Sequence, residues 1–431
     1  MSTSKSFQVI TVIDYSDPMQ MQIARQVSHW TMAASRLGNL EDLASPSAWA
    51  SLERYVGQVL RQNLTEAVNR LQQEAAVLQA QWHAAKTDEE LRQVRRQLVT
   101  FRRRYLRTET LLDFYADALN TRTNPDIAAL LRACDVLARR SMGQVLDRLR
   151  KITPPVLTYI DKGLGASILK SGLRLWDGST ESLVAAIKIV RHNLYRPTAL
   201  IHESGHQIAH IIGWNEELAA ALETELARES KEVADVWASW ASEIAADTFA
   251  FAHTGYAAVA GLHDVLAGGD RFVFRYRIGD PHPISYIRVL LGTEMCRRFF
   301  GAGPWNDLAE AWTRNHCLKN ASPGVRRLLR FSLPLLPKVV ELSLTKPMRA
   351  FEGRSLVALL DPKRVQSTTL IQLEQQAGPA LYTSPHWLWT EPVRLLGLTG
   401  YRAATLPERA EEVLQQQKDW MLRLGKTLQA A

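Results

Sequence analysis

Few cysteines and no long apolar run mark this 431-residue sequence, and each absence argues against a class of protein. The chain has three cysteines, Cys134, Cys296 and Cys317, and none of them belongs to a CxxC pair. An odd and sparse set does not suit a disulfide framework and fits a reducing compartment better. No uninterrupted apolar stretch reaches the roughly 18 residues that a membrane-spanning helix needs. We therefore expect a cytoplasmic protein with no transmembrane segment.

The N-terminus also lacks the pattern of a secretory signal, because Asp14 and Asp17 break its short apolar run. A hydrophobic fraction of 46% and a charged fraction of 22% are ordinary for a soluble globular protein. The net charge of +8 is moderate, and no nucleic-acid recognition module accompanies it. We therefore do not expect nucleic acid to be the partner.

Residues 47–120 have the pattern of two long helices joined as an antiparallel hairpin. Apolar residues in each recur at alternating steps of three and four, which predicts a narrow seam of coiled-coil type. Thr87 and Glu90 match a capping box that starts the second helix. The seam positions are Leu60, Leu64, Ala67, Leu71 and Leu78 in the first helix, and Leu91, Val94, Leu98, Phe101, Tyr105 and Leu112 in the second, with Glu74 and Thr108 as the polar exceptions.

The second helix of this hairpin carries a dense set of arginines. A solvated helix face is the simpler interpretation, and a docking surface for an acidic protein partner is the alternative. The arginines are Arg95, Arg96, Arg102, Arg103, Arg104 and Arg107.

Beyond the hairpin, Asn124-Pro125 predicts the start of a helix that ends before Thr153-Pro154-Pro155. Residues 156–177 are the only segment rich in β-forming residues and glycine, so we expect the strands there. Helices are expected to resume after Ser179. The predicted fold class is mainly α (α+β), with a small β-sheet.

The stretch RPTALIHESGHQIAHIIGW contains the pattern HExxH at His202, Glu203 and His206. Residues four apart on a helix lie one above the other, so both imidazoles can reach one metal ion with Glu203 beside it. Apolar neighbours predict a buried helix, where two histidines and a glutamate need compensation that a metal would provide. Alone the motif is suggestive, because two hydrogen-bonded core histidines would give the same pattern.

A second helical stretch, WASEIAADTFAFA, follows about forty residues later. Glu243 can supply a third ligand and leave a fourth position for water, as in catalytic zinc sites. Asp247, four residues on, can accept the free ring N–H of a ligating histidine and so fix its tautomer. His210 lies too far along the first helix to share an ion with His202, so we expect it in the core or beside the ligands.

These motifs resemble the gluzincins, the thermolysin-like zinc peptidases with HExxH followed by ExxxD. HESGHQIAH with SEIAADTFAFA is similar to the ImmA/IrrE-like peptidases, and DPHPISYIR, residues 280–288, resembles the HPxxxxR element of HtpX-like peptidases. The resemblance covers about residues 156–300. It implies zinc bound by His202, His206 and Glu243, Glu203 as catalytic base, and Asp247 supporting a ligand. The chain departs from these families in its long N-terminal region and in lacking transmembrane helices.

An oxyanion donor is harder to assign. His282 is our candidate, with Tyr256, Tyr276 and Tyr286 as alternatives. The segment 280–283 could equally be a rigid turn that caps the next helix. Arg288 either orients the surroundings of His282 or pairs with an acidic side chain.

Three regions follow: an N-terminal helical region at 1–152, a zinc metallopeptidase domain at 153–330, and a C-terminal region at 331–431 of unassigned fold that ends in a helix. The expected activity is zinc-dependent hydrolysis of peptide bonds in a protein or peptide substrate, with water activated by Zn²⁺ and Glu203. The alternative is a non-catalytic helical scaffold or regulatory binding protein with a structural metal site. Three ligands beside a glutamate favour catalysis, because structural zinc normally has four protein ligands. A zinc hydrolase with a non-peptide substrate remains open.

Overall fold

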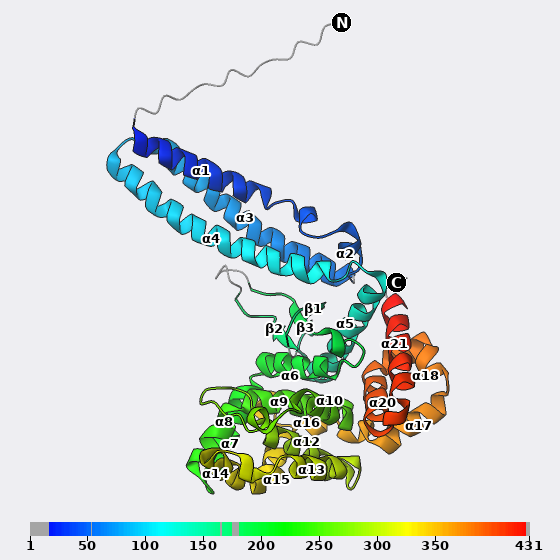
Figure 1. Ribbon diagram of the computed structural model, residues 1–431. Coiled ribbons are helices and arrows are strands. Elements are labelled where there is room, and N and C mark those ends of the chain that lie inside the picture. Colours follow the sequence, from blue (N-terminus) through cyan, green and yellow to red (C-terminus); the bar gives the residue numbers. More distant parts are fainter. Residues whose placement is uncertain (1–16, 53, 164–165, 175–180, 428–431) are drawn as a thin grey trace. The chain divides into compact units, whose positions relative to one another are not determined.

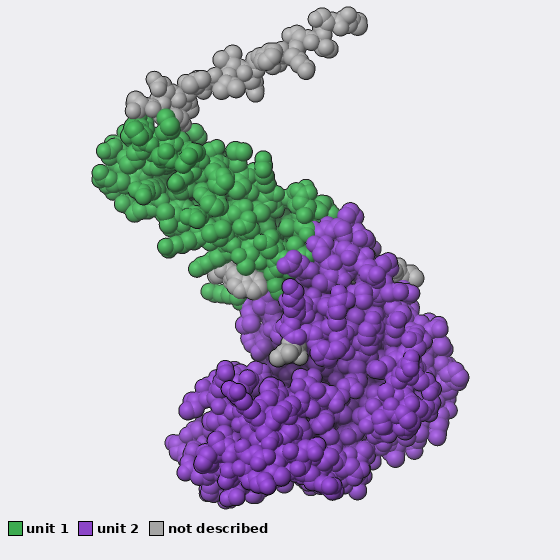
Figure 2. All heavy atoms as spheres, in the orientation of Figure 1, with its two compact units in different colours: residues 1–43, 61–116, 174–180 green, residues 44–60, 117–173, 181–431 purple. Residues whose placement is uncertain are grey.

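A computed structural model describes residues 17–52, 54–163, 166–174 and 181–427 (Figure 1). Helices dominate this part of the chain and three short strands form a small sheet, so the predicted mainly-α fold class is confirmed. No helix in the described ranges is both long and apolar enough to cross a membrane. The chain divides into two compact units (Figure 2): residues 1–43, 61–116 and 174–180 form unit 1, and residues 44–60, 117–173 and 181–431 form unit 2.

The expected hairpin is present as α3 (Arg54–Ala84) and α4 (Asp88–Asn120). Every apolar seam residue named above is buried, and Thr108 is buried with them. Glu74, the other polar exception, pairs with Arg104 across the two helices. The capping box is also confirmed: Thr87 N donates to a Glu90 carboxylate oxygen at 2.9 Å, and Glu90 N donates to Thr87 Oγ1 at 3.3 Å.

A third long helix, α1 (Pro18–Arg36), was not predicted from the sequence. The Asp17 side chain caps it by accepting hydrogen bonds from the backbone N–H of Met19 and Gln20. Its buried face, which includes Ile23 and Val27, belongs to the same apolar cluster as the seam of α3 and α4. Unit 1 is therefore built on three helices that lie side by side (Figure 1). The predicted absence of a signal sequence concerns residues 1–16, which lie outside the described residues.

Unit 2 contains the sheet, with strand order β1-β3-β2. β1 (Val156–Ile160) runs parallel to β3 (Ala185–Ile189), whereas β2 (Ser167–Leu169) runs antiparallel to it. The expectation of helix directly after Ser179 was wrong, because β3 comes before the next α-helix. Its alanines favour helices in isolation. Here the run AAIKI is the central strand and is almost wholly buried, so burial and pairing on both edges override the local propensity.

The long helices of unit 2 surround its core. α5 (Pro125–Leu146) begins at the predicted cap, where Asn124 accepts from the N–H of Asp126 and Ile127. The helices around the site are α6 (Thr198–Ile212), α7 (Trp214–Leu226), α8 (Lys231–Ser239), α9 (Ala241–Thr254), α10 (Tyr256–Leu266) and α12 (Ser285–Phe300). The remaining helices are α2 (Pro46–Ala50), α11 (Asp270–Val273), α13 (Pro304–Asn315), α14 (Pro323–Ser332), α15 (Leu336–Val340), α16 (Leu356–Leu359), α17 (Ser367–Ala377), α18 (Ala380–Thr383), α19 (Pro385–Thr390), α20 (Pro392–Thr405) and α21 (Ala410–Thr427).

The C-terminal helix α21 packs closely on α5, far earlier in the chain. A Cβ on Gly425 would lie only 1.8 Å from the backbone oxygen of Ala129, so no other residue fits there without a shift. Arg132 of α5 donates from Nε to the Gly425 carbonyl at 2.8 Å. α20 in turn packs on α9 and α10. The C-terminal region is thus part of the core that supports the helices described next.

Candidate metal centre

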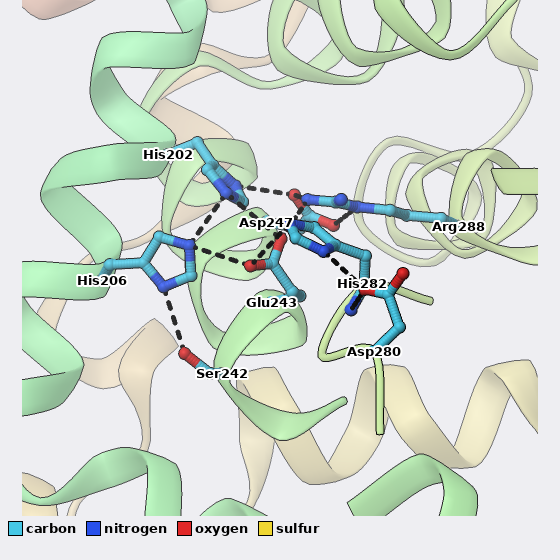
Figure 3. Close-up of polar contacts among 8 residues, drawn as sticks. All are labelled: His202, His206, Ser242, Glu243, Asp247, Asp280, His282 and Arg288. Carbon is cyan, nitrogen blue, oxygen red and sulfur yellow. Dashed lines mark hydrogen bonds and ion pairs between the residues drawn. The ribbon is translucent and has the colours of Figure 1, made fainter. Parts of the chain in front are cut away.

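Two neighbouring helices bring together the residues that the sequence singled out. His202 and His206 stand one turn apart on α6, and Glu243 stands in the first turn of α9 (Figure 3). Both helices are buried on most of their surface, because their flanking residues are alanine, leucine, isoleucine and phenylalanine. Buried helices of this kind hold ionisable side chains at fixed positions, away from water that would otherwise solvate them.

Gly205 allows the two helices to approach closely. A Cβ at this position would lie 2.8 Å from the Cα of Ala246 and 3.1 Å from its carbonyl oxygen. Any larger residue would therefore push α6 away from α9. Since Gly205 directly precedes His206, such a shift would also separate the histidines from Glu243.

The three side chains converge with short distances between their donor atoms. His202 Nε2 lies 3.1 Å from His206 Nε2. Glu243 approaches His206 Nε2 at 3.2 Å through Oε1, and His202 Nε2 at 3.5 Å through Oε2. Among the described residues, these three form the group whose geometry could hold a metal ion.

These distances fit zinc. Two ligands of a tetrahedral zinc ion, each about 2.0–2.1 Å from it, lie about 3.3–3.4 Å apart. The two imidazole nitrogens lie 3.1 Å apart and Glu243 Oε1 lies 3.2 Å from His206 Nε2, both near that value, whereas the 3.5 Å contact with His202 is made by the other oxygen, Oε2. The donor set of two imidazoles and one carboxylate is also one that zinc uses in catalytic sites. The residues present therefore fit the metal.

Asp247 and Arg288 contact the donor residues (Figure 3). Asp247 Oδ1 lies 2.8 Å from His202 Nδ1, an arrangement that leaves Nε2 facing the other donors. Arg288 of α12 bonds to Asp247 through two nitrogens, at 2.6 and 2.8 Å, and its NH2 lies 2.8 Å from Glu243. On His206, Nδ1 lies 3.1 Å from Ser242 Oγ. Every donor residue is thus held by a second side chain.

These contacts shift the pKa values of the buried groups. Burial lowers the pKa of His202, but its hydrogen bonds and charge interactions with Asp247 and Glu243 outweigh this and raise the pKa to about 10. Burial favours the protonated form of Glu243, yet Arg288 and the two histidines hold its pKa well below the ordinary value. Asp247 also has a lowered pKa despite burial, mainly because of Arg288.

Glu203 lies in the same buried region but belongs to neither the donor group nor an ion pair. It is 6% exposed and lines the cavity at the site, and burial raises its pKa. Three carboxylates, those of Glu203, Glu243 and Asp247, thus lie close to Arg288 and to the two histidines.

His282 approaches the site from the loop before α12. Its Nε2 lies 3.6 Å from Glu243 Oε1, and its side chain is 60% exposed. Asp280 Oδ1 accepts a hydrogen bond from the His282 backbone N–H and lies 2.8 Å from Nδ1. Among the described residues that line the cavity, none is Tyr256, Tyr276 or Tyr286. Of the four candidates for the oxyanion, His282 is therefore the one that reaches the site.

The site lies in a cavity of about 910 Å³. β2 forms part of its wall, and its lining also includes the half-buried Lys170. Gln207 of α6 holds the segment after β2: its Oε1 accepts from Ser171 N at 2.9 Å and its Nε2 donates to Ser171 O at 3.2 Å. The side chain next to His206 therefore ties this wall to the site helix.

Some residues lie elsewhere than the sequence predicts, and others have contacts that it does not predict. His210 is exposed, contrary to the expectation that it lies in the core or beside the ligands, because α6 emerges from the protein in its last turn. For Arg288 the sequence left two roles open, orienting the surroundings of His282 or pairing with an acidic side chain. Its ion pairs with Glu243 and Asp247 show the second role. Asp280 and Lys170 were missed as site residues. Asp280 stands inside the 280–288 element, which is the one signal that could have drawn attention to it.

A comparison of the chain with protein-family models gives no match, and comparisons with curated proteins and with solved structures give none either. The function proposed below is therefore inferred from the geometry of the site.

Proposed function

We propose that this protein is a zinc-dependent metallopeptidase, with zinc held by His202, His206 and Glu243. The observation that carries the proposal is the convergence of these three donors at zinc-like separations beside Glu203, in a cavity large enough for a substrate. When bound there, zinc would supply a Lewis acid that lowers the pKa of a water molecule and polarises the scissile carbonyl. The chain's own residues would move the protons and orient the substrate.

Glu203 is the proposed base. It takes a proton from the attacking water and later delivers it to the leaving amine. Its place on α6 next to His202, inside the cavity but outside the donor group, suits a group that handles protons rather than one that binds the metal.

His282 is the proposed oxyanion donor. Its exposed ring can meet a substrate, and Asp280 holds Nδ1 so that Nε2 is directed to the site. The same aspartate would stabilise the positive charge of the ring when Nε2 donates a hydrogen bond to the tetrahedral oxygen.

β2 is the proposed guide for an extended substrate. In β3, Ala185 N and Ile189 O bond to the β1 side, so the alternate residues Ala186 and Lys188 face β2. Their partners in β2 are used by that pairing, which leaves the backbone N–H and C=O of Ile168 at the free edge. Ile168 also lines the cavity, so a peptide could add to this edge through main-chain hydrogen bonds.

The exposed arginines of α4 support a docking role for unit 1. Arg95, Arg103 and Arg107 are exposed, and Val99 and Leu106 beside them are 48% and 41% exposed. An acidic protein segment with apolar residues of its own would complement this mixture. We propose that such a segment, in a substrate or an adaptor, binds there. The three free cysteines support a reducing, cytoplasmic setting.

A structural metal site is the competing function. Structural zinc is normally closed by four protein ligands. The donor group found among the described residues has three, and the cavity beside it is open to solvent through the exposed His282. These features favour catalysis.

The deciding experiment replaces Glu203 with glutamine, which keeps the size and removes the base. Zinc content and melting temperature should stay close to those of the wild type, while kcat on a peptide substrate falls at least 10²-fold. Glu216→Gln, an acidic residue one helix later, is the control and should leave kcat unchanged. A fully active Glu203→Gln enzyme would overturn the mechanism. A wild-type protein that binds zinc but cleaves no peptide would favour the structural site or a non-peptide substrate.

A further inference from the structure

Lys170 lies directly after β2, the strand proposed above to guide the substrate, and its side chain lines the cavity. Alternate residues of an extended chain face the same way, and Ile168 lines the cavity two residues earlier, whereas Leu169 between them does not. Two residues of extended chain span about 6.6 Å. A peptide that pairs with Ile168 would therefore pass Lys170 about two residues further along.

The backbone around Lys170 is held on both sides. Leu169 pairs with Ala186 of β3. Ser171 exchanges two hydrogen bonds with the side chain of Gln207, which is fully buried. Gln207 belongs to α6, the helix of the two histidines. The base of the Lys170 side chain thus has a fixed place relative to the proposed metal site.

The positive charge of Lys170 has no ion-pair partner in the cavity. Among the described residues of the lining, the other lysine or arginine side chains are both paired: Arg288 bonds to two carboxylates of the site, and Arg196 pairs with Asp264. No hydrogen bond or ion pair within the described parts of the chain engages the ammonium group of Lys170. It is therefore the fixed cation of the cavity that is free to meet a ligand.

The surroundings of this ammonium group favour a nearby anion. Burial lowers the pKa of Lys170, and charge interactions with Glu203, Glu243 and Glu216 oppose this without cancelling it. Those carboxylates therefore do not replace all of the hydration that the half-buried ammonium group has lost. A carboxylate that enters the cavity and accepts a hydrogen bond from Nζ would supply the missing partner.

We propose that Lys170 is a specificity-determining residue that binds a carboxylate of the peptide substrate, about two residues along from the position that pairs with Ile168. The proposal rests on the peptidase function proposed above and names its substrate class. An aspartate or glutamate side chain and a free C-terminus offer the same chemistry, and the experiment below distinguishes these two sources.

The test uses the full-length zinc-loaded enzyme. Cleavage of a proteome-derived peptide library, analysed by mass spectrometry, locates a cleavable bond. A series built on that peptide, made otherwise neutral, compares aspartate with asparagine at each flanking position and a free C-terminal carboxylate with an amide. We expect one carboxylate to raise kcat/KM at least about tenfold, mainly through a lower KM, because its contact with Lys170 is made by the bound substrate as well as in the transition state.

Two lysines on neighbouring strands provide matched variants. Lys170→Met should reduce kcat/KM of the carboxylate peptide to that of its neutral counterpart. Lys170→Arg should retain most of the preference, and Lys170→Glu should make the neutral peptide the better substrate. Lys188→Met removes the same charge from β3, where the side chain does not line the cavity, and should keep the preference. Zinc content is measured for each variant.

The outcomes separate the two proposals. Equal kcat/KM for carboxylate and neutral peptides, or a preference that survives in Lys170→Met, would overturn the role of Lys170 and leave the peptidase function standing. A fall of kcat by the same factor on every peptide in Lys170→Met would also overturn it, because Lys170 would then act on Glu203 instead of on the substrate. Absence of any zinc-dependent cleavage by the wild type would overturn the peptidase function and, with it, the substrate class.

Discussion

Arginine has opposite roles in the two units of this protein. In unit 1, residues 91–108 of α4 include seven arginines and no acidic residue, and their side chains point to solvent. In unit 2, Arg288 is 6% exposed and bonds to two carboxylates, while Arg122 is 1% exposed and bonds to Asp135. The first set is solvated, with ion pairs to Glu74 and Glu89 at the surface, whereas the second set is enclosed by protein groups.

This difference predicts at which positions a charged side chain can be replaced without a large loss of stability. Replacing a solvated arginine changes the free energy of unfolding little, because water fills the place of the side chain. A buried one leaves its partners charged and unpaired, which costs several kcal/mol. The same substitution should therefore have little effect on α4 and a large one around Glu243.

Removing a proposed metal ligand should have the largest effect. His206→Ala or Glu243→Ala should leave the purified protein with no stably bound zinc, measured by mass spectrometry of metals, and with no measurable peptidase activity, because the site has only three protein donors. His210→Ala, on the exposed last turn of the same helix, should keep about one zinc per chain. Full zinc retention by the Glu243 variant would remove it from the ligand set.

Replacing His282 should reduce the rate of peptide cleavage without loss of bound zinc. His282→Ala should lower kcat about 10²–10³-fold through the lost oxyanion donor, with zinc content unchanged. Asp280→Asn should have a smaller effect in the same direction, since it weakens only the orientation of the ring. An unchanged kcat for His282→Ala would move the oxyanion role to another group.

Arg288 should affect zinc affinity because it pairs with Glu243 and Asp247. Arg288→Met should weaken zinc affinity about 10–100-fold, as replacement of groups that support metal ligands typically does. The measurement is competition with a chelator of known affinity. Arg297→Met is the control on the same helix, where the side chain is 52% exposed and pairs only with Glu294. Equal affinities of both variants would show that Arg288 has only a packing role.

Charge reversal on α4 should have the smallest effect on stability. Arg103→Glu should change the free energy of unfolding by no more than about 0.5 kcal/mol, measured by denaturant titration. The triple change of Arg95, Arg103 and Arg107 to glutamate should leave zinc content and cleavage of a short neutral peptide unchanged, yet abolish binding of an acidic amphipathic peptide. Binding of that peptide by the triple variant would contradict the docking role. A large loss of stability would contradict the contrast between the units.

The sequence predicted what local periodicity encodes. The seam of α3 and α4, the capping box at Thr87 and the pairing of His202 with His206 on one helix face all depend on residues three or four apart. The placement of Glu243 beside them followed from a motif, not from periodicity.

The misses have a common physical origin in contacts between distant segments. β3 is a strand because β1 and β2 pair with its two edges and its side chains are buried, although its alanines favour a helix in isolation. Arg288 joins Asp247 from 41 residues away, and no spacing rule specifies such a pair. The apolar residues of α6 predicted a buried helix, and they did not show that its last turn, with His210, is exposed. By contrast, α1 carried a local signal at Asp17-Pro18 that was overlooked.

The packing of α21 on α5 has a consequence for when the protein can complete its fold during synthesis. α5 contacts α6, the helix of the two histidines, and its own packing is completed by Gly425 of α21, far later in the sequence. A nascent polypeptide on the ribosome will have exposed the HExxH segment long before that partner is translated. We therefore expect the proposed peptidase to become competent only after α21 has been translated and has packed on α5. Such a delay would keep the proposed activity from acting while α5 and α6 are still incompletely packed.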